Sequence, residues 1–80
     1  MFYRIHSVSP LPDKRLLVYF LDNTVKQYDV KPLIATMPVF HPLEEQALFD
    51  QVRVDAGGYG VVWNDELDLS SNELWENGVS

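Results

Sequence analysis

The stretch Arg15-Leu16-Leu17-Val18-Tyr19-Phe20-Leu21 is the longest run of mostly apolar residues in the chain, and it has the length of one β-strand. Side chains alternate between the two faces of a strand, and both alternating sets of this stretch are apolar. One face carries Leu16, Val18 and Phe20, and the other carries Leu17, Tyr19 and Leu21. Such a strand is either central and covered on both faces, or covered on one face by a partner.

Turn-forming residues lie on both sides of this strand. A first strand is predicted over Ile5–Leu11, where prolines mark its end, and Asp13-Lys14 supplies the turn into the second strand. Asp22-Asn23-Thr24 is a tight connection, because Asn and Asp tolerate the left-handed backbone region. A more polar third strand follows over Val25–Val30. Residues 5–30 therefore predict an antiparallel meander.

The remaining residues alternate between helical and extended patterns. Helices are expected over Leu33–Thr36 and Leu43–Asp50, on either side of a proline-containing connector, Met37–Pro42. Extended segments follow at Gln51–Asp55, Tyr59–Trp63 and Leu67–Leu69. A last helix starts at the capping box of Ser70 and Glu73 and runs through Trp75 or Glu76, with Gly78 as its C′ residue. We expect one α+β domain over residues 1–80, with an antiparallel sheet of about five short strands and two or three short helices.

Length and composition fit such a domain. The chain has 80 residues, of which 46% are hydrophobic and 22% charged, so it can bury a core, although a chain this short has a thin stability margin. It contains no cysteine, which rules out disulfides and thiolate metal sites. Residues 1–6 lack the apolar stretch of a signal peptide, and no apolar run approaches the roughly 18 residues of a membrane helix. We expect a cytoplasmic protein without membrane contact.

Charge is distributed unevenly along the chain. Residues 1–53 hold all six basic side chains and six acidic ones, whereas residues 54–80 hold six acidic and no basic side chains. The formal net charge of −6 therefore lies in the last third. Such a segment repels phosphate backbones and attracts a basic partner, unless it is simply a solvated surface. We expect a basic protein partner or self-association, and no direct contact with nucleic acid.

Three stretches, taken in order, resemble a known family. The first is Leu11–Val18, which leads to Phe20 and then to Tyr28–Leu33; the second is Leu48–Asp55, and the third is Gly60–Leu69. Together they resemble the bacterial domain-of-unknown-function family DUF2442 over nearly the whole chain. Members of that family typically have a Trp-Pro-Asn-Gly-like turn, from which Trp63-Asn64-Asp65-Glu66 departs.

This resemblance implies a small α+β domain that occurs alone or fused to a DNA-binding helical domain. It also implies a gene that stands beside a second small gene, in an arrangement that looks like a toxin–antitoxin pair. The resemblance implies no catalytic residues. An antitoxin-like role is therefore an expectation at the level of the family.

The motifs that suggest a cofactor or a metal have simpler explanations. Gly57-Gly58-Tyr59-Gly60 lacks the Lys and the helix of a phosphate-binding loop and predicts a hairpin turn. Asn64–Asp68 has alternating carboxylates but lacks the Gly and Glu of a calcium-binding loop at the required spacing, and it predicts a surface turn. His6 and His41 have no neighbouring ligand in the sequence. We expect neither a cofactor nor a metal.

The chain also lacks a catalytic pattern. None of the candidate nucleophiles stands in a nucleophile-elbow context; these are Ser7, Ser9, Ser70 and Ser71. Glu44 and Glu45 are adjacent, so on a helix they point about 100° apart and do not share a site. We expect that the protein is not an enzyme.

The main functional hypothesis is a protein-interaction module that binds its partner through the acidic last third. The candidate partner-binding residues are Asp65, Glu66, Asp68, Glu73, Trp75 and Glu76. Trp is enriched at interface hot spots, although Trp75 can equally fold back to cap the core. The alternatives are a homodimer that pairs the exposed face of the doubly apolar strand 15–21, and a domain that binds a small ligand.

Overall fold

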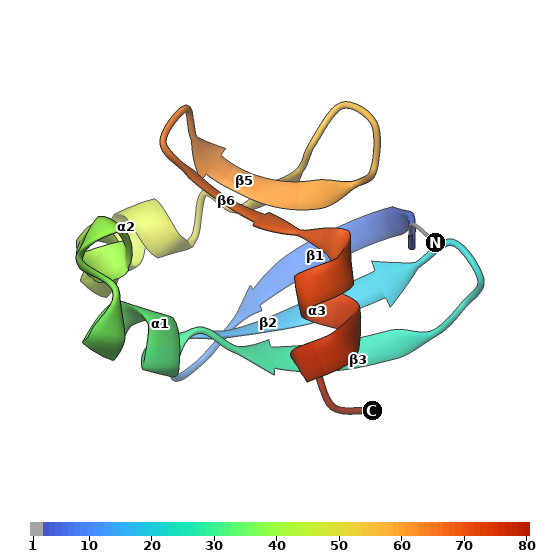
Figure 1. The fold of residues 1–80 in the computed structure, drawn as a ribbon, viewed down its shortest axis with the longest axis horizontal. Coiled ribbons are helices and arrows are strands. Elements are labelled where there is room, and N and C mark those ends of the chain that lie inside the picture. The colour runs from blue at the N-terminus through green and yellow to red at the C-terminus, as the bar shows by residue number, and fades with distance from the viewer. Residues whose placement is uncertain (1–2) are drawn as a thin grey trace.

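The computed structural model describes residues 3–80 and has two small antiparallel sheets with short helices at their ends (Figure 1). The first sheet has the order β1-β2-β3 and the second sheet the order β4-β5-β6. The strands are β1 (Ile5–Leu11), β2 (Arg15–Phe20), β3 (Val25–Asp29), β4 (Arg53–Val54), β5 (Gly60–Asn64) and β6 (Leu67–Ser70). The helices are α1 (Lys31–Thr36), the 3₁₀ helix η1 (Pro38–Glu44), α2 (Gln46–Phe49) and α3 (Ser71–Asn77).

The predicted α+β class is confirmed, and the predicted meander over residues 5–30 is the first sheet. The strand count differs from the prediction, because six strands within residues 3–80 form two sheets instead of about five forming one. Leu67–Ser70 is a full strand that pairs along β5, and β4 also pairs with β5. This local pairing makes residues 53–70 a sheet of their own, which lies over the first sheet (Figure 1).

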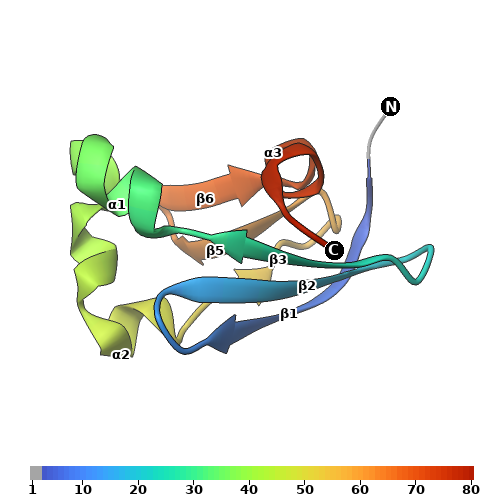
Figure 2. The same cartoon turned by 90° about the horizontal axis from the view of Figure 1, so that it is seen from below.

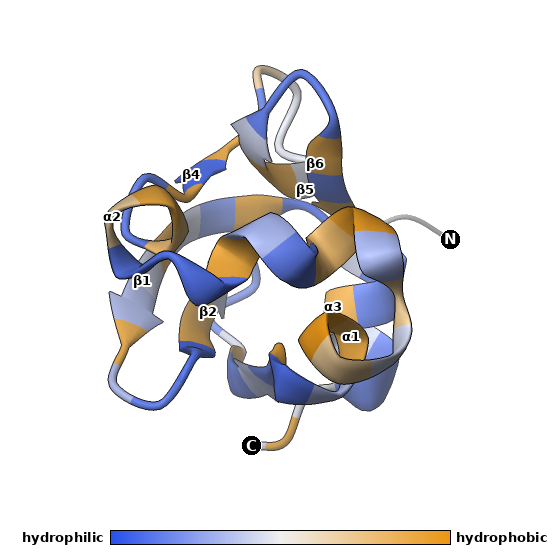
Figure 3. Ribbon diagram, turned by 90° about the vertical axis from the view of Figure 1, so that its left-hand side faces the viewer, coloured by the Kyte–Doolittle hydropathy of each residue, from blue (hydrophilic) through white to orange (hydrophobic). Residues whose placement is uncertain are grey.

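One hydrophobic core fills the space between the two sheets. From the first sheet, Leu16, Val18 and Phe20 point into it and are almost completely buried. From the second sheet, Trp63 is buried and its ring Nε1 donates a hydrogen bond of 3.1 Å to the carbonyl oxygen of Phe49. Each fully buried large apolar side chain stabilises the fold by roughly 1.5–3 kcal/mol. In Figure 3 hydrophobic and hydrophilic residues follow each other along the ribbon, most visibly in the helices that face the viewer.

The helical connection between the sheets differs from the prediction. Residues 37–42 are predicted as an irregular connector, but η1 spans Pro38–Glu44, and α2 is shorter than the predicted helix over residues 43–50. Bonds of the 3₁₀ type run from Phe40 N–H to the Met37 carbonyl and from Glu45 N–H to the Pro42 carbonyl. Proline fits the start of such short turns, where its missing N–H leaves no bond unmade.

The last helix starts as predicted and runs to Asn77, beyond the predicted end at Trp75 or Glu76. Ser70 Oγ accepts a hydrogen bond of 3.1 Å from the backbone N–H of Glu73. Gly78 ends the helix with a φ of −79°, outside the left-handed region. A glycine is required there because a Cβ atom would lie 2.5 Å from the carbonyl oxygen of Leu74.

Within residues 3–80, no helix is both long and apolar enough to cross a membrane. The cytoplasmic location stays a prediction.

Candidate interaction surface

The first sheet buries one face and leaves the other uncovered by any helix or strand of residues 3–80 (Figure 2). Residues that lie opposite each other in an antiparallel ladder share a face, so the register defines this outer face. Its three rows are Ser7–Tyr19–Val25, Ser9–Leu17–Gln27 and Leu11–Arg15–Asp29. These nine residues form the outer face of the first sheet.

One end of the outer face is apolar and exposed. Tyr19 and Val25 lie directly opposite each other and are 41% and 36% exposed. Leu17, in the next row, is partly buried. Leu21, which follows β2, is 53% exposed. The sequence therefore predicts correctly that strand 15–21 is apolar on both faces, and the structure covers only one of them with the described chain.

The residue Val79 extends this surface beyond β3. Gln27 and Val79 exchange two backbone hydrogen bonds of 2.7 and 2.8 Å in an antiparallel bridge. The side chains of a bridged pair point to the same face of a sheet, so Val79, which is 67% exposed, joins the outer face next to Gln27. No sequence pattern predicts this position, because the contact is made by backbone groups between residues far apart in the chain.

The other end of the outer face is charged. Arg15 lies opposite Asp29, and its Nη1 donates a hydrogen bond of 3.2 Å to Gln27 Oε1. Slight burial raises the pKa of Asp29, but hydrogen bonds from Lys31 and the charges of Lys31 and Arg15 outweigh it and hold the pKa below its usual value. The outer face thus carries an apolar patch, a row with polar groups and an adjacent plus–minus pair.

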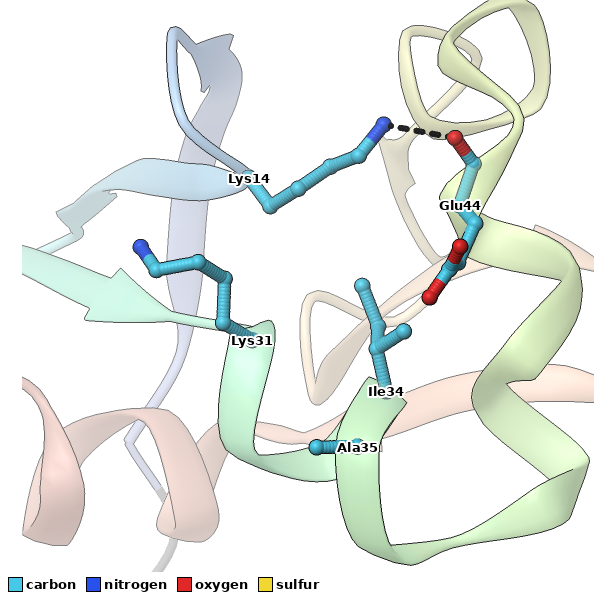
Figure 4. A pocket seen from close by; sticks show the side chains of 5 residues that line it. All are labelled: Lys14, Lys31, Ile34, Ala35 and Glu44. Atoms are coloured by element: carbon cyan, nitrogen blue, oxygen red, sulfur yellow. Dashed lines mark hydrogen bonds between the residues drawn. The ribbon is translucent and has the colours of Figure 1, made fainter.

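A pocket of about 320 Å³ lies beside this charged end (Figure 4). Lys14 Nζ crosses its rim and donates hydrogen bonds to the Glu44 carbonyl at 3.1 Å and to Gln46 Oε1 at 2.8 Å. Lys31 Nζ is held by the carboxylates of Asp13 and Asp29, each at 3.0 Å. Ile34 and Ala35 complete the lining. Lys14 therefore connects the β1–β2 turn to η1 and α2, and Lys31 connects the start of α1 to the β1–β2 turn and to the end of β3.

The structure places the predicted acidic partner-binding residues in the β5–β6 turn, on β6 and on α3. Asp65 and Glu66 are exposed in the β5–β6 turn, and Glu76 is exposed on α3, which follows the other end of β6 (Figure 1). Asp68 is exposed on β6 between them.

Glu73 is partly buried, and its carboxylate makes hydrogen bonds within the protein. One of its carboxylate oxygens accepts hydrogen bonds from the Tyr28 hydroxyl at 2.8 Å and from Asn77 Nδ2 at 2.9 Å. Burial, together with the hydrogen bond to Glu73 and its negative charge, raises the pKa of Tyr28 well above its usual range. This contact fastens α3 to β3.

The ring of Trp75 folds back against the core, which is one of the two alternatives that the sequence leaves open. It stacks on Tyr3 with ring centroids 4.0 Å apart and planes 2° apart, and it meets the Phe20 ring edge-on at 4.9 Å. Lys26 Nζ lies 4.5 Å from the ring centroid and donates a hydrogen bond to the Trp75 carbonyl. These contacts give Trp75 a structural role, and the ring is still partly exposed.

The other motifs form ordinary turns. Asp55 Oδ1 accepts hydrogen bonds from the backbone N–H groups of Gly57 and Tyr59, and Gly58 takes a φ of +78°. Asn64 Oδ1 accepts from the N–H groups that follow it in the β5–β6 turn. Among residues 3–80, no group of three or more His, Asp or Glu side chains is arranged to hold a metal ion.

Comparison with known proteins gives a likeness of fold. The chain resembles the crystal structure of the candidate DNA-binding protein NE0471 from Nitrosomonas europaea ATCC 19718, with a TM-score of 0.74 and 21% sequence identity. The match covers 91% of this chain and 46% of that chain, so the chain spans less than half the length of NE0471. No curated protein matches the chain.

This likeness corrects one prediction. The exclusion of direct nucleic-acid contact, which was based on the acidic net charge, is wrong, because the same fold occurs in a candidate DNA-binding protein. Net charge describes the whole chain and does not by itself determine what one surface of a fold contacts.

The family comparison confirms the resemblance that the motifs indicate. A family model described as "Protein of unknown function (DUF2442)" matches residues 5–80, and the chain therefore belongs to this family.

Proposed function

We propose that this chain is a protein-interaction module that docks its partner on the outer face of the first sheet. The observation that carries the proposal is the gathering of the exposed side chains of Tyr19, Val25 and Val79 on one uncovered sheet face. Exposed apolar side chains that cluster on one face, with polar groups around them, are typical of protein-interaction sites. Single exposed apolar side chains are common on protein surfaces and do not by themselves indicate a binding site, so it is the clustering that carries the argument.

The composition of the outer face supports a protein as the partner. Interface cores favour aromatic residues and are depleted in charge, and the surrounding rim is polar. Tyr19 supplies the aromatic residue at the apolar end, whereas Ser7, Ser9 and Gln27 supply polar groups around it. The family resemblance implies an antitoxin-like role. An antitoxin that binds its toxin protein and covers part of its surface would be one example of such a protein-interaction module.

DNA is the second ligand to test. The specific reason is that NE0471, which shares this fold, is described as a candidate DNA-binding protein. A module that joins a DNA-binding protein to another protein is consistent with both the exposed apolar outer face and the likeness to NE0471. The experiment therefore has to distinguish binding to a protein from binding to nucleic acid.

Photo-crosslinking from defined positions tests the proposal. The photoreactive amino acid benzoylphenylalanine replaces Tyr19 in one variant and, in the control, Tyr59, a tyrosine beside the second sheet that is 50% exposed against 41% for Tyr19. A third variant carries it in place of Asp68, within the acidic segment. After irradiation in the native cells, adducts are identified by mass spectrometry with and without nuclease.

We expect a discrete protein adduct from the Tyr19 position, either with another protein or with the chain itself, and little from the other two positions. Adducts formed mainly from the Asp68 position would assign the partner to the acidic segment instead. A Tyr19 adduct that contains only nucleic acid would replace the protein partner with DNA or RNA.

A further inference from the structure

The geometry points to a second copy of this chain as an occupant of the outer face, in one particular register. We infer a two-fold axis that runs parallel to the strands, midway between β2 and β3, so that β2 of each copy lies over β3 of the other. The inference rests on the proposed function, because it uses the same face. It adds the identity of the partner and the pairing of individual residues.

Charge complementarity selects this register. Arg15 and Asp29 lie side by side at the same end of adjacent strands. An axis between these two strands places Arg15 of each copy over the partner's Asp29, which makes two opposite-charge contacts. The exposed fraction of the Asp29 side chain is 47%, so it has room for a second cation besides Lys31.

The other face-to-face registers are unfavourable. An axis along β2 places Arg15 over the partner's Arg15, which brings like charges together. An axis perpendicular to the strands places the charged row of each copy over the apolar row of the other, where charges lose water without gaining a counter-charge. An axis midway between β2 and β3 avoids both the contact between like charges and the burial of charges without a counter-charge.

The same axis also matches the uncharged rows. Tyr19 of each copy lies over the partner's Val25, so the most exposed apolar row becomes the centre of the contact. Leu17 lies over the partner's Gln27, and Val79 lies over the partner's Ser9 at the edge. Two sheets packed face to face in this way keep their strand directions within about 30° of each other.

The area of the outer face predicts a weak dimer. A stable interface usually buries about 800 Å² from each partner, and a three-stranded sheet this short offers less than that. We expect a dissociation constant on the order of 100 μM, so that the dimer forms at high local concentration. Low ionic strength favours it, because the Arg15–Asp29 contacts lie at the rim and are screened by salt.

Mixing two charge-reversal variants tests the register. In Arg15→Glu the introduced carboxylate faces the partner's Asp29, and in Asp29→Arg the introduced guanidinium faces the partner's Arg15. Each variant alone is expected to self-associate at least about tenfold more weakly than the wild type. In a mixture, each of the two contacts joins opposite charges again, so association is expected to return to within about threefold of the wild-type value.

The design separates association from folding. The pairing of Arg15 with Asp29 inside one chain stays broken in both variants, so recovery in the mixture has to come from contacts between chains. Sedimentation equilibrium up to 1 mM measures association, and circular dichroism checks that each variant is folded. If Asp29→Arg does not fold, amide chemical shifts of the wild type on dilution provide a second measurement, with concentration-dependent changes expected at residues 17, 19, 25, 27 and 79.

A wild-type chain that remains monomeric at 1 mM would overturn the inference, as would a mixture that associates no better than either variant alone or dilution shifts confined to the second sheet. The proposed function fails separately. If photo-crosslinking from the Tyr19 position captures a different protein while the chain is monomeric, the outer face is an interaction site and the second copy is not its occupant.

Discussion

Tyr19 and Val25 lie directly opposite each other on β2 and β3, and both side chains are exposed although every neighbouring inward-facing residue of β2 is buried. A cross-strand pair of an aromatic and a β-branched residue stabilises a sheet by roughly 0.2–1 kcal/mol. This stabilisation is also available to a buried pair, so it does not explain why Tyr19 and Val25 are exposed. The pair lies beside Leu17 and close to Val79, which extends the apolar surface. This surface is the basis of the proposed role in protein binding.

Replacing Tyr19 and Val25 by Thr is expected to weaken self-association without unfolding the protein. Thr keeps the strand propensity, and both positions are already exposed, so the free energy of unfolding changes by less than about 1 kcal/mol. Self-association measured by sedimentation is expected to weaken at least tenfold. Val62→Thr, on the outer side of the second sheet, is the control and is expected to leave association unchanged; equal losses in both variants would contradict the assignment to the outer face.

Removing the Trp75 ring is expected to destabilise the fold. Trp75→Ala loses the stacking on Tyr3, the edge contact with Phe20 and the cation–π contact with Lys26. Urea denaturation is expected to show a loss of about 2–3 kcal/mol, below the value for a completely buried Trp because the ring is partly exposed. Glu76→Gln, on the exposed side of α3, serves as the control. A fully stable Trp75→Ala variant would show that the ring serves a partner instead of the core.

Stability is expected to fall at high pH because of Tyr28. Its pKa is higher in the folded protein than in the unfolded chain, so the folded state holds the hydroxyl proton more tightly. The resulting stabilisation is complete below the unfolded pKa of about 10 and is lost as the pH rises above it, by at most about 1.4 kcal/mol per pH unit. Urea denaturation between pH 8 and 11 is expected to show a shallower dependence in Tyr28→Phe and in Glu73→Gln. An unchanged dependence in Tyr28→Phe would rule out this contribution.

A methyl group is expected to be tolerated differently at two glycines of the β4–β5 hairpin. A Cβ atom at Gly60 would lie 2.5 Å from the carbonyl oxygen of Leu69, which is backbone of the neighbouring strand and cannot move alone. Gly60→Ala is therefore expected to cost about 2 kcal/mol or more. At Gly57 the nearest atom is Cδ2 of the Tyr59 side chain at 2.8 Å, and a side chain adjusts its position more readily than the backbone of a paired strand. Thermal unfolding of the two variants checks the order, and a reversed order would contradict the pairing of β5 with β6.

Local patterns predict much of this fold. The first strand has the predicted bounds, Ile5–Leu11, because alternation and flanking turn residues are properties of neighbouring residues. Asp13 and Lys14 take positive φ values of 65° and 55° in the turn predicted there. The Ser70 hydroxyl caps the first turn of α3 as predicted, whereas the Glu73 carboxylate, the other half of the predicted capping box, accepts hydrogen bonds from Tyr28 and Asn77.

Contacts between distant residues account for what the sequence does not predict. Division into two sheets depends on which strands pair, and the place of Val79 depends on a backbone bridge to Gln27. The position of the Trp75 ring depends on contacts with Tyr3 and Lys26, which are far from it in the sequence. The sequence shows that the last third of the chain is acidic. Where these acidic side chains lie in space, around β6, is determined by the fold and cannot be read from the charge pattern.

The comparison of crosslinking from the Tyr19 and Tyr59 positions tests the central claim most directly, because both side chains are exposed and lie on different parts of the surface. A protein adduct is expected to form from the Tyr19 position in clear excess over the Tyr59 position. Equal yields from both positions, or an adduct from the Tyr59 position alone, would show that the outer face of the first sheet is not where this protein binds its partner.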